Sequence, residues 1–99
     1  MEKITPPTVT LLAEGKDLIA KQMQGFAGQA MPIHHASVEF IVFVFEGECI
    51  FRMNEKETVL KSGDAIAIPP LVKHQIKVVK DFKGIHFMPK DIAFKFFKQ

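Results

Sequence analysis

Three of the four histidines in this chain lie far apart in the sequence, each beside apolar residues. They are His34, His74 and His86. Imidazole nitrogens bind divalent transition metals, and three of them plus a water molecule make an open coordination site. One hypothesis is therefore a metal site for zinc, iron, manganese, nickel or copper at these three residues. The alternative is that each histidine is only a hydrogen-bonded residue at the mouth of a cavity.

Three further residues have side chains that could take part in such chemistry. His35 follows His34 directly, and only one of two neighbouring side chains can point inward from an extended strand. Glu39 could be a ligand if a bulge shifted its strand, and is otherwise expected to be an exposed neighbour of the site. Cys49 is the single cysteine, so it can form no intrachain disulfide, and a buried free cysteine behaves as a small hydrophobic residue.

The sequence predicts that the elements that position these residues are short strands. Runs rich in Val, Ile and Phe alternate with turn signals such as Gly47, Ser62-Gly63-Asp64 and Pro69-Pro70. This pattern predicts an all-β fold, a small antiparallel barrel or sandwich. Gly47 and Gly63 are expected at sharp turns that need positive φ.

The run 38–45 is almost wholly apolar, so both of its faces must be covered. Alternate residues of a strand point to opposite faces, so one set can fill a barrel while the other needs a second sheet or a subunit. We expect a core barrel over about residues 8–89. The tail 90–99 could form a strand or one or two helical turns.

Two segments resemble the signature motifs of the cupin superfamily. The first runs from Gly28 to Glu48 and is compared with G(X)5HXH(X)3-4E(X)6G; the second runs from Gly63 to His74 and is compared with G(X)5PXG(X)2H(X)3N. The resemblance implies a cupin jelly roll, also called a double-stranded β-helix, as a single domain over residues 1–99. It also implies inward His and Glu residues that converge on a divalent metal, and activities of the dioxygenase, isomerase or decarboxylase type.

The first motif departs from the family pattern at the metal ligands. Six residues before Gly47, the family's Glu position is occupied by Phe40, while Glu39 is one place off and therefore on the opposite face. Only one of the two motif histidines can be present, either His34 or His35 according to the direction of counting. A Phe at this position favours a barrel interior without metal or water, because an unpaired buried carboxylate there would cost about 2–7 kcal/mol.

The second motif departs at two further positions. His74 is retained, but Leu71 stands where the family has Gly, and Val78 where it has Asn. At most two of the four expected metal ligands are therefore in place. We expect no resident cofactor as the first interpretation, with a divalent transition metal as the alternative.

The functional hypothesis is a small-molecule-binding or sensing module, with an unknown small molecule held in the barrel. Apolar residues such as Met31 would line the pocket beside the predicted site residues, which are His34, His35, Phe40, Phe51, Met53, His74 and His86. The alternative is a metal-dependent cupin enzyme that uses the three-His site. A third interpretation is a structural accessory protein whose barrel is merely a core.

Composition and charge limit the classes of partner that we expect. The chain has 99 residues, a net charge of +2, ten Phe and neither Tyr nor Trp. The lysines of the C-terminal third stand singly among apolar residues, as solvent-facing strand positions do, so neither nucleic acid nor membrane is an expected partner. Ile41, Phe43, Phe45 and the Phe residues of the tail fit inter-sheet packing or a subunit interface, and the resemblance to cupins implies a homodimer. A lone cysteine and the lack of an apolar leader favour a cytoplasmic protein.

Overall fold

The computed structural model describes residues 3–97, and every regular element in that range is a β-strand. The strands are β1 (Lys3–Ile4), β2 (Thr8–Glu14), β3 (Leu18–Gly25), β4 (Gln29–Ala30), β5 (His34–Ala36), β6 (Phe40–Met53), β7 (Lys56–Lys61), β8 (Ala65–Ile68), β9 (His74–Pro89) and β10 (Phe94–Phe96). The predicted all-β fold is confirmed. Within residues 3–97 no helix is long and apolar enough to cross a membrane.

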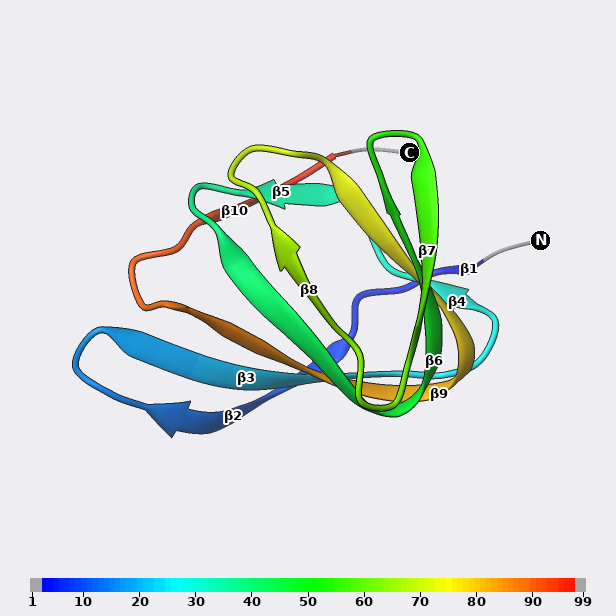
Figure 1. Ribbon diagram of the computed structural model, residues 1–99, viewed down its shortest axis with the longest axis horizontal. Coiled ribbons are helices and arrows are strands. Elements are labelled where there is room, and N and C mark those ends of the chain that lie inside the picture. The colour runs from blue at the N-terminus through cyan, green and yellow to red at the C-terminus, as the bar shows by residue number, and fades with distance from the viewer. Residues whose placement is uncertain (1–2, 98–99) are drawn as a thin grey trace.

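Two long strands, β6 and β9, build the barrel because each belongs to both of its halves (Figure 1). Residues 40–46 of β6 pair with β8 on one side and with the end of β9 on the other. The end of β9 pairs in turn with β3, and β3 with β2. Residues 48–53 of β6 pair with β7 on one side and with the start of β9 on the other. The start of β9 pairs in turn with β4 and β5. The strands are antiparallel except for the short β1–β4 pair. The sheet therefore curls over itself as a small antiparallel barrel.

The bend in β6 is centred on Gly47, where the register to β9 shifts. Gly47 has φ +85°, and a Cβ atom there would overlap the backbone of Lys80 and Asp81. Only glycine allows both the left-handed conformation and this close approach. Gly63 has φ +96° in the turn before β8. The predicted positive φ is confirmed at both glycines, although β6 runs through Gly47 instead of ending there.

The interior of the barrel is filled by alternate residues of β6. Phe40, Val42 and Val44 are each at most 2% exposed, whereas Ile41 and Phe45 face outward. Beyond Gly47, after a one-residue shift at the register change, the alternation resumes and buries Cys49 and Phe51. Burial raises the pKa of the Cys49 thiol to about 12, so it is an unreactive core group. The period-2 interpretation of this segment is confirmed.

Both ends of the described chain belong to the barrel. β10 pairs with β5 so that Phe94 lies opposite Ala36 and Phe96 opposite His34. The described part of the tail, up to residue 97, thus contains a strand and no helix, while residues 98 and 99 lie outside the described residues. At the other end β1 pairs with β4. The pairing extends beyond the expected core limits of 8 and 89, because each terminal strand supplies hydrogen bonds to an otherwise open edge.

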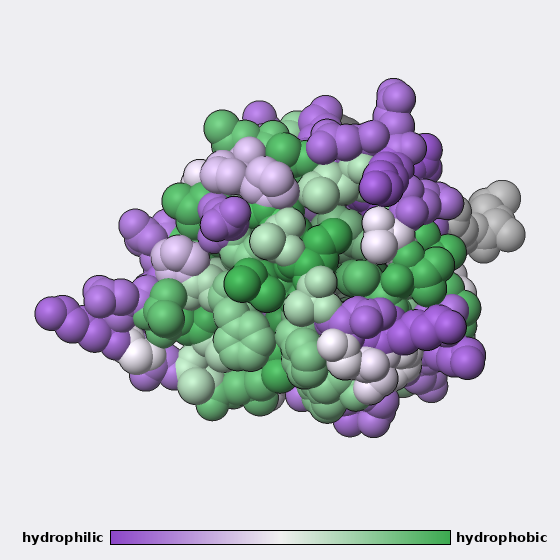
Figure 2. All heavy atoms as spheres, viewed as in Figure 1, coloured by the Kyte–Doolittle hydropathy of each residue, from purple (hydrophilic) through white to green (hydrophobic). Residues whose placement is uncertain are grey.

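The outer surface of one half of the barrel is apolar. Ile41 of β6 lies opposite Phe87 of β9, and these side chains are 46% and 47% exposed. Phe43 and Ile85 form the next pair along the same strands. We call these four residues the outer apolar face. Apolar side chains also fill the middle of the surface in Figure 2, around β6 and β8, with hydrophilic ones at its rim.

Candidate functional site

A cavity of about 290 Å³ lies inside the barrel between β3, β9 and β10. Its walls are almost entirely apolar, and three side chains supply nitrogen atoms: Lys21, His34 and His86. The lining residues are Pro6, Pro7, Val9, Lys21, Met23, Met31, Pro32, His34, His86, Met88, Phe94 and Phe96. Of the predicted site residues, the structure places His34 and His86 in this wall, together with Met31.

His34 and His74 meet at the edge of this cavity, although forty positions separate them in the chain. They are register partners of β5 and β9, and their Nε2 atoms are 3.0 Å apart. The Nδ1 atom of each ring lies 3.0 Å from the carbonyl oxygen two residues earlier, that of Pro32 for His34 and that of Val72 for His74. Both rings are buried, at 8% and 3% exposure. The backbone thus fixes the orientation of each imidazole.

The hydrogen bonds of this pair need more protons than two neutral imidazoles hold. Each of the two Nδ1–carbonyl contacts needs an N–H, and the Nε2–Nε2 contact needs a third. Two neutral imidazoles carry two such protons, whereas a pair with one added proton carries three. Burial opposes that charge: it lowers the pKa of His34, and burial followed by the nearby His34 lowers the pKa of His74 to about 4. At neutral pH one of the three contacts therefore lacks a proton.

Phe40 contacts the rings of both His86 and His74. Its ring lies edge-on to His86, with centroids 5.4 Å apart, and 5.8 Å from the ring of His74. Burial, followed by the charges of His34, His74 and Lys21, lowers the pKa of His86 to about 3. His86 is therefore neutral at physiological pH, and it lines the cavity as a hydrogen-bonding group and not as a cation.

The donor set falls short of a usual resident metal. Two imidazoles bound to one ion at 2.0–2.1 Å, at a right angle, have nitrogens about 3.0 Å apart, which the His34–His74 separation matches. A catalytic site needs a third protein ligand as well. Among residues 3–97 no group of three His, Cys, Asp or Glu side chains is placed to hold an ion. The three histidines of the metal hypothesis are thus near one another without sharing a common centre.

The remaining predicted site residues lie around the cavity in different roles. Phe51 stacks on His74, with ring centroids 5.4 Å apart, and so packs against one face of that imidazole. Met53 lies with His74 in a separate, more open hollow of about 660 Å³. His35 points to the opposite face of β5, where its ring packs against Phe97. Between the two adjacent histidines, it is His34 that faces the interior.

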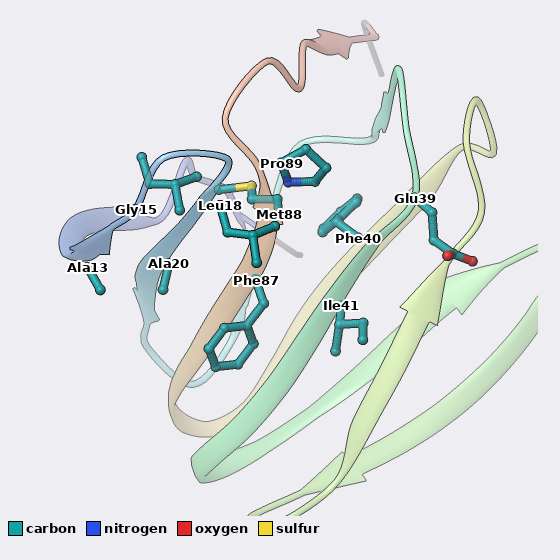
Figure 3. A pocket seen from close by; sticks show the side chains of 11 residues that line it. Ala13, Gly15, Leu18, Ala20, Glu39, Phe40, Ile41, Phe87, Met88 and Pro89 are labelled. Carbon is teal, nitrogen blue, oxygen red and sulfur yellow. The ribbon is translucent and has the colours of Figure 1, made fainter.

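Glu39 lies at a third hollow, of about 530 Å³, where the β2–β3 hairpin approaches the start of β6. Figure 3 shows the apolar side chains of Leu18, Ile41 and Phe87 around this hollow and the Glu39 carboxylate turned away from them. Glu39 is exposed and one residue before the inward-facing Phe40. No bulge brings its carboxylate toward the imidazoles, since β6 and β9 keep a regular register from Ile41 to Val44.

Sequence reasoning missed Lys21 and the two phenylalanines of β10. The alternation of β3 carries a detectable signal, because Ile19, Lys21 and Met23 share a face and Met23 is buried. For Phe94 and Phe96 no local signal exists, since three Phe in four residues fit neither strand nor helix period. Their place in the wall is set by the pairing of β10 with β5.

A family model for the cupin domain matches residues 22–85 of the chain. No curated protein matches the chain. The family match covers both motif segments from the second half of β3 onward, including His34, Phe40 and His74. It ends at Ile85, one residue before His86.

Solved structures match over nearly the whole chain at low identity. A cupin-2 domain protein from Shewanella frigidimarina has a TM-score of 0.77 at 18% identity, covering 87% of this chain and 83% of that one. A protein with a double-stranded beta-helix domain from Klebsiella pneumoniae has 0.82 at 20%, covering 95% and 86%. Salicylate 1,2-dioxygenase from Pseudoaminobacter salicylatoxidans, in complex with gentisate, has 0.84 at 17%, covering 100% of this chain but only 32% of that one. These similarities establish the fold.

Proposed function

The chain belongs to the cupin domain family, and from that premise we propose that it binds a small, mainly apolar molecule inside its barrel. The observation that carries the proposal is the cavity of about 290 Å³, whose wall combines buried side chains such as Met23, Met31 and Met88 with an exposed rim at Val9 and Phe96. Ligand sites are concave and mostly apolar, with a few placed polar groups that orient the ligand. Here the polar groups that can meet a ligand are the ammonium group of Lys21 and the neutral imidazole of His86, beside the His34–His74 pair.

The size of the cavity limits the ligand. Pockets for drug-sized ligands span about 300–1,000 Å³, so this cavity is at the lower end and suits one ring or a short branched chain. Met23, Met31 and Met88 form part of the wall, and flexible thioether side chains can adjust to different apolar shapes. These features favour binding or sensing of a small compound over a purely structural barrel.

Methyl resonances of the methionines provide the test. We expect benzamide and benzoate, each a single ring, to shift the methyl signals of Met23, Met31 and Met88 in ¹H–¹³C spectra. The signal of Met53, which lies in a different hollow, should move less. Val9→Phe should weaken binding of both probes because Val9 lines the cavity.

A matched control exists for this substitution. Val59 of β7 is as exposed as Val9, each at 51%, but belongs to the wall of none of the three hollows described above. Val59→Phe should therefore leave probe binding unchanged. Absence of cavity methyl shifts with both probes at millimolar concentration would contradict a binding function for this cavity.

The alternative proposal is a metal-dependent cupin enzyme of the dioxygenase, isomerase or decarboxylase type. The Nε2–Nε2 separation of 3.0 Å is the observation that favours it. One structural relative is a dioxygenase in complex with gentisate, although the present chain spans only a third of it. This proposal comes second because the site lacks a third protein ligand for the metal. Substitution of Phe40 by glutamate tests it.

We also propose that the protein forms a homodimer through the outer apolar face, in the cytoplasm. Side chains such as Ile41 and Phe87, almost half exposed and directly opposite each other, are covered by a partner in most proteins. Sedimentation velocity should give a dimer for the wild type and a monomer for Phe87→Lys, because a charge in the centre of such an interface costs association energy. Val59→Lys, on β7, should remain dimeric. A monomeric wild type at micromolar concentration would overturn the proposal.

A further inference from the structure

A single cationic side chain lies in the wall of the barrel cavity. Lys21 is on β3 and points inward with its neighbours Ile19 and Met23, and its register partner on β9 is His86. Strand alternation places an inward lysine among apolar residues only rarely, because burying an ammonium group without a partner is costly. Lys21 is half-buried, so its stem lies in the wall while its ammonium group stays partly in contact with solvent.

Lys21 makes no ion pair within 4.0 Å with an acidic side chain of residues 3–97, as far as that part of the chain is described. The carboxylate that feels its charge is Glu14, whose pKa is lowered mainly by Lys90 and only slightly by Lys21. Glu14 is bonded to Lys90 at 2.8 Å, so its charge is already compensated. No residue of the cavity wall is acidic. The positive charge of Lys21 is therefore available to a ligand.

The other polar groups of the wall cannot act as counterions for Lys21. His34 and His86 are neutral at physiological pH because burial holds the pKa of each ring down. A neutral imidazole can donate or accept one hydrogen bond at each nitrogen. Both nitrogens of His34 already have partners in Pro32 and His74. The wall thus offers a ligand one cation, the neutral imidazole of His86, and a set of Met and Phe side chains for an apolar body.

Building on the proposed function, we infer that the ligand class is a small organic monocarboxylate. Its carboxylate would lie on the Lys21 ammonium and its ring or short chain among Met23, Met88 and Phe94. Charge-assisted hydrogen bonds are about twice as strong as neutral ones, and beside a mainly apolar wall two charges attract more strongly than in bulk water. A doubly charged anion fits less well, because the wall has one cation only.

Two probes of equal shape test this inference. Benzoate and benzamide differ in charge and not in ring size, so their affinities are compared by titration of the Met methyl signals at constant ionic strength. We expect benzoate to bind the wild type about tenfold more tightly than benzamide. Lys21→Met keeps the apolar stem and removes the ammonium, and should abolish this preference. Lys56→Met, at an exposed position of β7, should preserve it.

The outcomes distinguish a failure of the monocarboxylate inference from a failure of the proposed binding function. Equal affinities for both probes in the wild type, or an unchanged benzoate preference in Lys21→Met, would overturn the monocarboxylate inference and leave the cavity as a binding site for neutral compounds. Failure of both probes to shift any cavity methyl signal would overturn the proposed binding function itself. Raising the salt concentration should weaken benzoate binding and not benzamide binding; equal weakening of both would contradict a role for charge.

Discussion

Replacing Phe40 with glutamate is expected to lower the free energy of unfolding of the metal-free protein by at least about 5 kcal/mol, enough to unfold many domains of this size. Phe40 is 2% exposed and packs against His74, His86 and Phe94. Loss of its ring leaves a cavity, and the new carboxylate has no positively charged partner among these neutral or apolar neighbours. Urea unfolding followed by circular dichroism measures the loss.

The same variant should recover on addition of cobalt(II) or zinc(II). The carboxylate then joins the facing Nε2 atoms of His34 and His74, and three protein ligands suffice for a transition metal. An ion that binds only the folded state stabilises it by mass action. The wild type, by contrast, should hold well under one metal ion per chain by elemental analysis, both as purified and after reconstitution.

Two variants control this experiment. Phe40→Leu lacks the carboxylate and should be destabilised without recovery on metal addition. In Phe40→Glu combined with His74→Ala the recovery should vanish. A wild type that holds a stoichiometric divalent ion, lost on His74→Ala, would show that Phe40 does not prevent metal binding and would favour the enzyme proposal.

Acidification should destabilise the wild type strongly between pH 7 and pH 5. In the unfolded chain a histidine takes up a proton near pH 6.5, whereas the folded-state pKa is about 4 for His74 and about 3 for His86. Between these values the unfolded state binds more protons, so stability falls as the pH falls. His74 and His86 should each contribute a loss of about 2 kcal/mol over this interval, and His34, whose pKa is also lowered, adds to it.

Urea unfolding at pH 7, 6 and 5 measures this dependence, and His86→Phe isolates one contribution. An apolar ring at position 86 faces Phe40 and Phe94, so the variant should fold while its stability falls less steeply with acidification than that of the wild type. The comparison uses the slope and not the absolute stability, because the substitution also changes packing. A stability that is flat from pH 7 to pH 5 would show that the histidines are not held neutral in the folded state.

Much of the local architecture follows from the order of residues. The alternation along residues 38–45 assigns Phe40 to the interior and Ile41 to the surface, because successive strand residues point to opposite faces. The turns at Gly47 and Gly63 follow from the need for positive φ, and the departure from the metal motif is visible as a Phe in place of a Glu. Each of these features depends on a few consecutive residues.

The site itself was decided by contacts between strands that are far apart in the chain. Whether His34 or His35 faces the interior depends on the pairing of β5 with β9, which brings His34 to His74 across forty positions. The pairing of β10 with β5 closes the cavity with Phe94 and Phe96, and the pairing of β3 with β9 sets Lys21 beside His86. Periodicity in a sequence fixes which side chains share a face of one strand, but the neighbours of that strand are chosen by the packing of the whole barrel.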